Sequence, residues 1–193
     1  MNRESEYKLQ RRVSGYHDIR MDGMTDLVIR AKGASVFDIG CNRGLVSFEM
    51  ANNGATLCHG CDIDPGCIDV ARGVFADLRA VESRFAVIDL TEGPNAVGNA
   101  FGDMYYDIVL CLATYHKLKR IMAPEAIDAL FVDFGRRTKK FFGWRATGDK
   151  PDENEDEMKA IDSHMKRAGL RRIHTSYISA TLGVAAIWSP LYK

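Results

Sequence analysis

Three aspartates, Asp38, Asp62 and Asp89, each stand at the end of a short apolar segment. A carboxylate in such a place can accept two hydrogen bonds from the hydroxyls of a ribose, which suits Asp62, or one from the exocyclic amine of adenine, which suits Asp89. Asp38 could order the turn that follows it or face a cationic amino group. Each aspartate alone could equally be a turn or capping residue. Together, one strand–helix unit apart, they predict a single nucleotide-binding crevice.

The turn after Asp38 contains Gly40 and Gly44, with Cys41 and Asn42 between them. Glycine permits a positive φ and lets a ligand approach the backbone closely. Residues 45–53 are a predicted helix whose first N–H groups would point toward the same place, so a nucleotide-like or carboxylate-bearing ligand is expected. The G-x-G-x-x-G pattern of dinucleotide oxidoreductases lacks its glycine at position 42, which makes that class a weaker alternative. No G-x-x-x-x-G-K-[ST] phosphate loop is present.

Apolar runs alternate with helical patterns through most of the chain. Strands are predicted at 36–39, 56–62, 85–90, 106–112, 139–144, 171–178 and 184–188, and helices at 24–31, 45–53, 65–80, 124–136 and 155–168. Strands separated by helices predict an α/β fold with a doubly wound, Rossmann-like parallel sheet and helices on both faces. Residues 179–183 are too few for a crossover helix, so the last two strands should form an antiparallel hairpin at one edge. Residues 149–157 form an acidic stretch that should lead into a helix as a loop.

Composition narrows the class of protein. A chain of 193 residues with 46% hydrophobic and 27% charged residues suits one globular domain. No segment approaches the ~20 apolar residues of a membrane span, and residues 1–12 lack a secretory signal, so a cytoplasmic location is expected. Equal numbers of basic and acidic residues, 26 each, disfavour nucleic acid without excluding a local basic patch.

The five cysteines are an odd number in apolar surroundings, which predicts reduced thiols. Cys58 and Cys61 have the spacing of half a zinc site. However, residues three apart in a strand point to opposite faces, and no second ligand pair is suitably spaced. No metal site is expected.

Four segments of the chain stand out together: Asp38-Ile-Gly-Cys-Asn-Arg-Gly44, Gly60-Cys-Asp-Ile-Asp64, Val87-Ile-Asp-Leu90 and Tyr106-Asp-Ile-Val-Leu-Cys111. In this order they resemble the successive motifs of the class I S-adenosylmethionine-dependent methyltransferases. The resemblance covers residues 34–145 directly. It implies a seven-stranded, mostly parallel sheet with an antiparallel last strand. It also implies S-adenosylmethionine as cofactor and S-adenosylhomocysteine as product.

The same resemblance implies a set of cofactor contacts. Gly40, Cys41 and Gly44 would line the methionine part, Asp62 would hold the ribose, Ile63 would flank the adenine, and Asp89 with Leu90 would contact its edge. Asp38, Asn42 and Cys111 complete the predicted cofactor-binding set. Asn42 and Arg43 replace the small residues common in this turn.

Methyl transfer from a sulfonium is an in-line displacement that needs an aimed nucleophile and the exclusion of water. Residues 112–118 follow the fourth strand and, by the resemblance, lie beside the methyl group. His116 is the candidate base for a hydroxyl acceptor, and Tyr115 could pack over the cofactor or shape the acceptor pocket. A helix-entry residue or structural hydrogen-bond donor is the alternative role for His116. The Asn or Asp followed by Pro-Pro-Tyr of many N-methyltransferases is absent.

The chain ends and strand ends offer further candidates. By the same resemblance, residues 1–33 would form a helical lid that precedes the core of residues 34–193. Within this lid, Tyr16, His17 or Arg20 could contact the ligands or simply lie in a surface turn. Trp144 and Arg145, at the end of the fifth strand, are expected to face the crevice, or else to cover a strand end and lie in solvent.

The expected activity is O-methylation of a small polar or sugar-like acceptor. An RNA or protein methyltransferase is one alternative, and a non-catalytic subunit that binds S-adenosylmethionine is another. An RNA acceptor would be favoured by one basic patch made of Arg136, Arg137, Lys139, Lys140, Arg171 and Arg172. No membrane contact is expected, and the sequence leaves the oligomeric state open.

Overall fold

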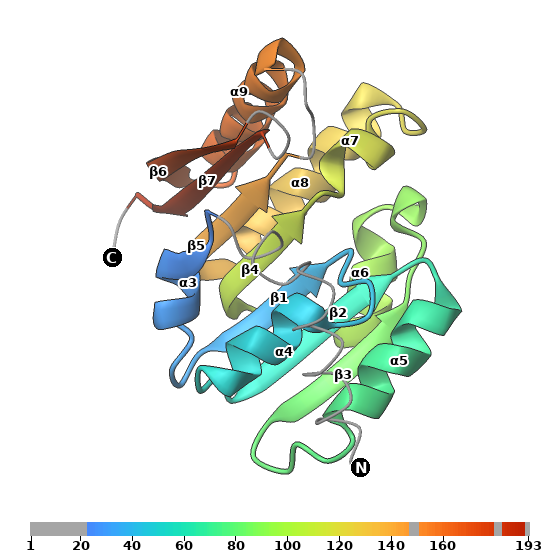
Figure 1. The fold of residues 1–193 in the computed structure, drawn as a ribbon. Coiled ribbons are helices and arrows are strands. Elements are labelled where there is room, and N and C mark those ends of the chain that lie inside the picture. The colour runs from blue at the N-terminus through green and yellow to red at the C-terminus, as the bar shows by residue number, and fades with distance from the viewer. Residues whose placement is uncertain (1–22, 147–150, 180–182, 192–193) are drawn as a thin grey trace.

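The structure is a computed structural model that describes residues 23–146, 151–179 and 183–191. Its central element is one seven-stranded sheet (Figure 1). The strands are β1 (Ser35–Ile39), β2 (Leu57–Asp62), β3 (Glu82–Val87), β4 (Tyr106–Leu112), β5 (Thr138–Arg145), β6 (Leu170–Ser179) and β7 (Gly183–Pro190). Their order is β3-β2-β1-β4-β5-β7-β6, and β7 alone runs against the other six. The predicted doubly wound sheet and its antiparallel last strand are confirmed, with β6 and β7 pairing as a hairpin at the edge.

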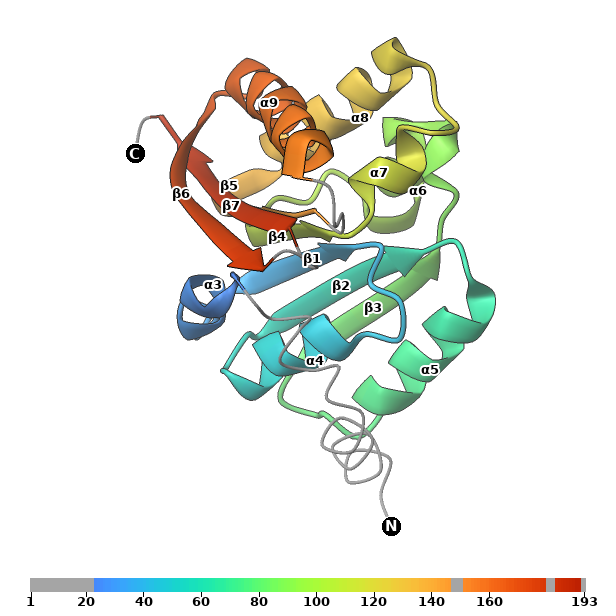
Figure 2. The same cartoon turned by 45° about the horizontal axis from the view of Figure 1, so that its top comes forward.

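Helices cover both faces of the sheet (Figure 2). They are α3 (Thr25–Ile29), α4 (Leu45–Asn52), α5 (Pro65–Phe75), α6 (Pro94–Phe101), α7 (Tyr115–Leu118), α8 (Pro124–Arg136) and α9 (Pro151–Arg167), with a 3₁₀ turn, η1 (Leu90–Glu92). Buried residues of α3, α4 and α5 share one apolar cluster, and those of α6, α8 and α9 share the other. The helices change sides between β1 and β4, and open α/β sheets bind ligands at such a switch point.

Strand residues alternate between the two clusters, as a period of two requires. On β1, Val36 packs under α4, whereas Phe37 packs under α6 and α8 and stacks on Tyr106 with ring centroids 5.0 Å apart. Cys58 and Cys61 of β2 likewise lie in opposite clusters. The prediction that these two cysteines point to opposite faces of their strand is therefore confirmed.

Several element boundaries differ from the predicted ones. Strand β3 begins and ends three residues earlier than expected, because it pairs with β2 from Leu57 to Asp62 and releases Ile88 and Asp89 beyond the sheet edge. The predicted acidic loop before α9 is partly helical from Pro151, since acidic side chains are stabilised in the first turns of a helix. The short helices α6 and α7 were not anticipated. Among the described residues, no helix has the length and apolar composition that a membrane crossing requires.

Candidate functional site

A cavity of about 450 Å³ opens at the carboxyl ends of strands β1 to β5. Five segments contribute its walls: the turn from β1 into α4, the ends of β2 and β3, the segment from the end of β4 to Ile121, and the last residue of β5. The lining residues are Asp38, Gly40, Cys41, Asn42, Val46, Asp62, Ile63, Ile88, Asp89, Leu90, Thr91, Leu112, Ala113, Thr114, Lys117, Leu118, Ile121 and Arg145. The three predicted strand-end aspartates thus meet in one place.

The turn after β1 is fixed by Asp38 and shaped by Gly40. The Asp38 carboxylate is 2% exposed, and its Oδ2 accepts a hydrogen bond of 2.7 Å from the buried Ser47 hydroxyl of α4. Gly40 has a φ of +72°, and a Cβ there would run into the Thr114 hydroxyl at the end of β4. A side chain at position 40 would therefore push the β1 and β4 turns apart.

Asp62 ties the first turn to the second. Its Oδ2 accepts from the Asn42 backbone N–H at 2.9 Å, and its Oδ1 accepts from the Asp64 N–H at 3.1 Å. A carboxylate has about four acceptor positions, so each oxygen can still accept a hydrogen bond from a ligand hydroxyl. This geometry suits a ribose diol.

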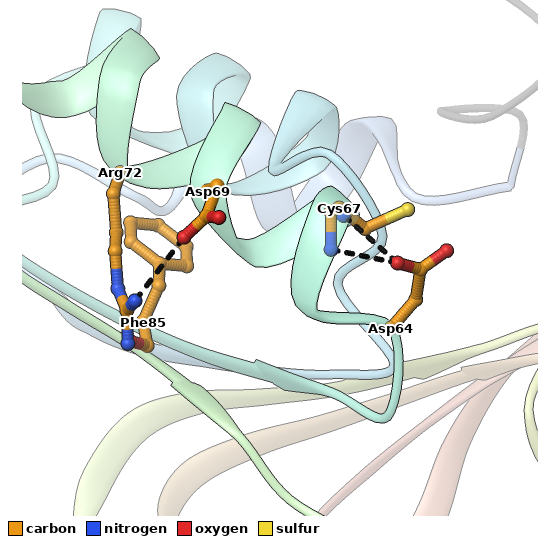
Figure 3. A network of polar contacts seen from close by, with 6 residues as sticks. Asp64, Cys67, Asp69, Arg72 and Phe85 are labelled. Atoms are coloured by element: carbon orange, nitrogen blue, oxygen red, sulfur yellow. Dashed lines mark hydrogen bonds and ion pairs between the residues drawn. The ribbon is translucent and has the colours of Figure 1, made fainter.

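Asp64 has a different task from Asp62, although both follow β2. Its Oδ1 caps α5 by accepting from the Gly66 and Cys67 N–H groups at 2.8 and 3.2 Å (Figure 3). Bonds from Cys67 and then Gly66 lower the pKa of the Asp64 carboxyl. Farther along α5, Arg72 Nε donates to the Phe85 carbonyl at 3.0 Å and so fastens the helix to β3. The loop that follows Asp62 is therefore joined to the start of α5 by Asp64, and α5 is in turn joined to β3.

Asp89 follows β3 and begins the 3₁₀ turn η1. Its Oδ1 accepts from the Thr91 hydroxyl at 2.7 Å and from the Thr91 N–H at 2.9 Å, and these bonds lower the pKa of the Asp89 carboxyl. Ile88 and Leu90 on either side are buried and line the cavity with it. The ionised Asp89 carboxylate, between two apolar side chains, can accept a hydrogen bond from an amine at the edge of a flat ring.

The far side of the cavity belongs to β4, α7 and β5. Ala113 adopts a φ of +59°, which is rare for alanine, and its N–H donates to the Arg145 carbonyl at 3.0 Å. Thr114 follows, and its hydroxyl lies 3.2 Å from the Leu112 carbonyl and 3.4 Å from that of Ile39. Lys117 of α7 and Arg145 of β5 bring two cations to this side.

Four of the predicted site residues do not line the cavity. Gly44 precedes α4 with a φ of +73°, and a Cβ there would lie 3.0 Å from the Ala71 Cβ of α5, so this glycine allows α4 and α5 to pack closely. Cys111 is fully buried on the α8 and α9 face of β4. Tyr115 is buried, and His116 is half-buried beside it. Their assigned roles stay predictions.

Tyr115 belongs to a polar chain that joins three helices. Its hydroxyl lies 3.4 Å from His164 Nε2 of α9, and His164 Nδ1 lies 2.9 Å from Asp128 Oδ1 of α8. The other Asp128 oxygen pairs with Arg167. The chain anchors α7, and with it the Lys117 side of the cavity, to α8 and α9.

The cysteine of the first turn is unsuited to nucleophilic chemistry. Burial, followed by the nearby Asp38, Cys61 and Asp62, raises the pKa of the Cys41 thiol far above its ordinary value. Burial similarly raises the pKa of Cys61 to about 12. A thiol is reactive only as the thiolate, so Cys41 contributes a small apolar surface to the cavity.

Some site residues escaped sequence reasoning, and some predictions cannot be compared with the structure. Val46, Thr91 and Ile121 line the cavity without a motif to mark them, although Val46 could have been inferred from its place in the first turn of α4. Of the pair after β5, Arg145 lines the cavity whereas Trp144 packs on the opposite face of the sheet against Trp188. The candidate lid residues Tyr16, His17 and Arg20 lie outside the described residues.

Comparison with known proteins gives a family and a fold. A family model described as a methyltransferase domain matches residues 36–138, just over half of the chain. The sequence is not significantly similar to any curated protein.

Three solved structures illustrate the fold. Magnesium protoporphyrin IX methyltransferase from Synechocystis PCC 6803 with bound SAM has a TM-score of 0.63 and 17% identity over 98% of each chain. A S-adenosylmethionine-dependent methyltransferase from Clostridium acetobutylicum ATCC 824 has a TM-score of 0.65 and 9% identity, over 90% of this chain and 92% of that one. A putative RNA methyltransferase from Pyrococcus horikoshii has a TM-score of 0.62 and 14% identity, over 88% and 82%. At these identities the likeness shows the fold alone.

Proposed function

We propose a specific reaction for this chain, which belongs to the methyltransferase domain family and is a class I S-adenosylmethionine-dependent methyltransferase. The proposed reaction is methylation of an oxygen atom of a small polar or sugar-like acceptor. The observation that carries the proposal is a cavity that joins an acidic half, beside β2 and β3, to a half with hydroxyl and cationic groups beside β4 and β5. Its volume of about 450 Å³ lies in the range of small-molecule sites.

S-adenosylmethionine is the cofactor, and the acidic half of the cavity suits it. Asp62 would accept from the ribose hydroxyls, Asp89 from the adenine amine, and Ile63 with Leu90 would contact the adenine ring. The backbone of Gly40 and its neighbours would border the methionine part, where a Cβ has no room. The sulfonium supplies an electrophilic methyl carbon; the acceptor oxygen bonds to it as the carbon–sulfur bond breaks and its electron pair stays on sulfur.

The hydroxyl proton of the acceptor must leave during this displacement, and we assign it to His116. Burial, then the charges of Lys117 and Arg120, lower the pKa of His116 below its ordinary value of 6.5. The imidazole is therefore neutral at pH 7 and able to accept a proton. It stands beside Lys117, a cavity residue, on the same short helix. Tyr115, buried and within reach of His164, would act as a positioning residue for this helix.

The arrangement of basic residues supports a small acceptor over RNA. Three of the six residues of the expected patch are engaged by acids: Arg137 pairs with Asp133 at 2.6 Å, Lys140 with Asp107 at 3.0 Å and Arg172 with Asp162 at 3.2 Å. All six also precede or begin β5 and β6, and parallel strands put those ends at the sheet edge opposite the cavity. A polymer bound there could not place an acceptor atom in the cavity directly.

The domain organisation forms part of the proposal. The proposed organisation is a single methyltransferase domain, with a cofactor-binding core in residues 34–193 and an N-terminal helical lid segment in residues 1–33, of which residues 1–22 lie outside the described part of the chain. The helical part of that segment, α3, packs Met24 and Leu27 against Gly143 of β5 on the same face as α4.

The direct test is binding followed by transfer. Calorimetry should detect S-adenosylmethionine and S-adenosylhomocysteine but not NAD. The protein should then release S-adenosylhomocysteine when mixed with the cofactor and a panel of small hydroxyl compounds, and not with RNA. Transfer to RNA alone would contradict the assignment. Tight cofactor binding without transfer to any acceptor, in cell extract as well as in the panel, would favour a non-catalytic subunit.

A further inference from the structure

The cavity is divided by charge. Asp38, Asp62 and Asp89 lie toward β1, β2 and β3, whereas the cations Lys117 and Arg145 line the part beside β4 and β5. At neutral pH, S-adenosylmethionine carries a sulfonium, an ammonium and a carboxylate, and so has a net positive charge. The acidic half complements that cofactor, and the cationic half has the opposite preference.

The position of Arg145 follows from the alternation of side chains between the two faces of β5. It pairs with Leu112 of β4, and both residues line the cavity. Gly143, two residues earlier, faces α3 on the same side of the sheet, while Trp144 between them faces the other side. Arg145 is 6% exposed, so its guanidinium is held at the cavity wall and not out in solvent.

Lys117 approaches from the adjoining segment. Its backbone N–H donates to the Thr114 carbonyl at 3.1 Å, and the preceding Ala113 N–H donates to the Arg145 carbonyl at 3.0 Å. The β4–α7 loop that leads to Lys117 is therefore bonded directly to the strand end that carries Arg145. Unlike Arg145, the Lys117 side chain is exposed, so it can swing toward a ligand that enters the cavity.

We propose that Arg145 and Lys117 form an oxyanion-binding subsite in the acceptor half of the cavity, and that the methyl acceptor carries a carboxylate or phosphate group. The planar guanidinium fork can bind two oxygens of such a group at once, and an ammonium adds a movable charge. Leu112, Leu118 and Ile121 supply an apolar wall beside the subsite. The inference rests on the proposed function, because it names the class of acceptor that the same cavity would take.

The experiment uses the whole chain saturated with S-adenosylhomocysteine, so that the cofactor's own carboxylate site is filled. Inorganic phosphate and acetate are titrated separately at constant ionic strength and followed by NMR or calorimetry. The variants are Lys117→Gln and Arg145→Lys, the latter keeping the charge but losing the fork. The matched control is Lys139→Gln, an exposed lysine near the opposite end of β5 that does not line the cavity. Melting curves report whether each variant is folded.

One of the two anions should bind, and each cavity substitution should weaken its binding about tenfold, the size expected for losing one charge-assisted hydrogen bond. Lys139→Gln should leave it unchanged. The stronger of phosphate and acetate identifies the anionic group. The inference is overturned if neither anion binds, if Lys117→Gln binds it as well as wild type, or if Lys139→Gln weakens it equally. It is also overturned if phosphate or acetate displaces S-adenosylhomocysteine, because the cations would then serve the cofactor.

A transfer assay separates this inference from the function on which it depends. Each active hydroxyl compound is tested as its free acid and as its amide or neutral ester. A preference of about tenfold or more for the acid, lost in Lys117→Gln, supports the subsite. Equal transfer to the neutral partner refutes the subsite while leaving the methyltransferase assignment in place.

Discussion

Gly40→Ala offers a quantitative test of how the β1 and β4 turns shape the cavity. Gly40 has a φ of +72°, and the new Cβ would meet the Thr114 side chain, whose Cβ and Cγ2 both lie 3.2 Å away and whose hydroxyl lies closer still. An alanine in this backbone conformation costs about 1–2 kcal/mol. Overpacking in a close-packed region adds about 1–3 kcal/mol. We expect Gly40→Ala to lower the free energy of unfolding by about 2–5 kcal/mol in total.

Gly33 provides the matched control. It has the same φ of +72° but no atom within 4 Å of an added Cβ, and it precedes β1 at the sheet edge opposite the cavity. Gly33→Ala should therefore show the backbone cost alone, about 1–2 kcal/mol. The difference between the two variants measures the contact with Thr114.

Urea denaturation of a double-mutant cycle with Thr114→Ala isolates that contact. Removing the Thr114 hydroxyl and methyl should recover about 1–3 kcal/mol in the Gly40→Ala background. Calorimetry with S-adenosylhomocysteine should show at least about tenfold weaker binding for Gly40→Ala, and wild-type affinity for Gly33→Ala. Equal destabilisation by the two alanines, or no recovery on removing the Thr114 side chain, would refute the steric argument.

Three further substitutions test individual assignments. Asp62→Ala should weaken S-adenosylhomocysteine binding by about 10–100-fold, because the ribose and the glycine turn both lose a charged acceptor, whereas Asp69→Ala on the exposed face of α5 should bind normally. If neutral His116 is the base, kcat/KM should rise with pH to a plateau, with the midpoint of the rise below pH 6.5, and His116→Gln should lose about 100-fold in rate together with that limb. A limb that survives in His116→Gln argues for another base. Tyr115→Phe removes the hydroxyl that lies 3.4 Å from His164 and should cost about 0.5–1.5 kcal/mol of stability with little change in kcat. A large fall in kcat at unchanged stability would show that this hydroxyl takes part in the chemistry.

The strand-end acids were predictable because apolar runs mark parallel strands, and parallel strands end at one edge. That argument correctly brought Asp38, Asp62 and Asp89 together, and it also pointed to Arg145. It could not decide between Arg145 and Trp144, since the face that each one occupies depends on the pairing of β5 with β4. The alternation of side chains shows that Trp144 and Arg145 lie on opposite faces of the sheet, but it does not show which of them faces the ligand.

The segment after β4 was harder to predict for a conformational reason. Ala113 has a φ of +59°, and no sequence rule assigns that conformation to alanine. The turn it creates sets the direction in which α7 leaves the sheet. Tyr115 is consequently directed toward His164 and the core, while Lys117 reaches the cavity. A four-residue helix is also too short to show a periodic apolar face, so the sequence gives no sign of which side is buried.

The two turns that flank the switch point share a feature that explains how an open sheet edge can hold a fixed cavity. Asn42 after β1 and Ala113 after β4 are the non-glycine residues with positive φ in the described part of the chain, at +51° and +59°. Such conformations persist only when surrounding contacts hold them. Asp62 binds the Asn42 N–H, and the Arg145 carbonyl binds the Ala113 N–H, so residues of the neighbouring strands β2 and β5 fix the two turns. The two residues hold the walls in different ways: Asp62 uses its side chain, whereas Arg145 uses its backbone carbonyl. Substitution of Asp62 should therefore disturb the turn after β1 as well as ribose binding, whereas Arg145→Lys should leave the turn after β4 in place and change only the binding of the oxyanion.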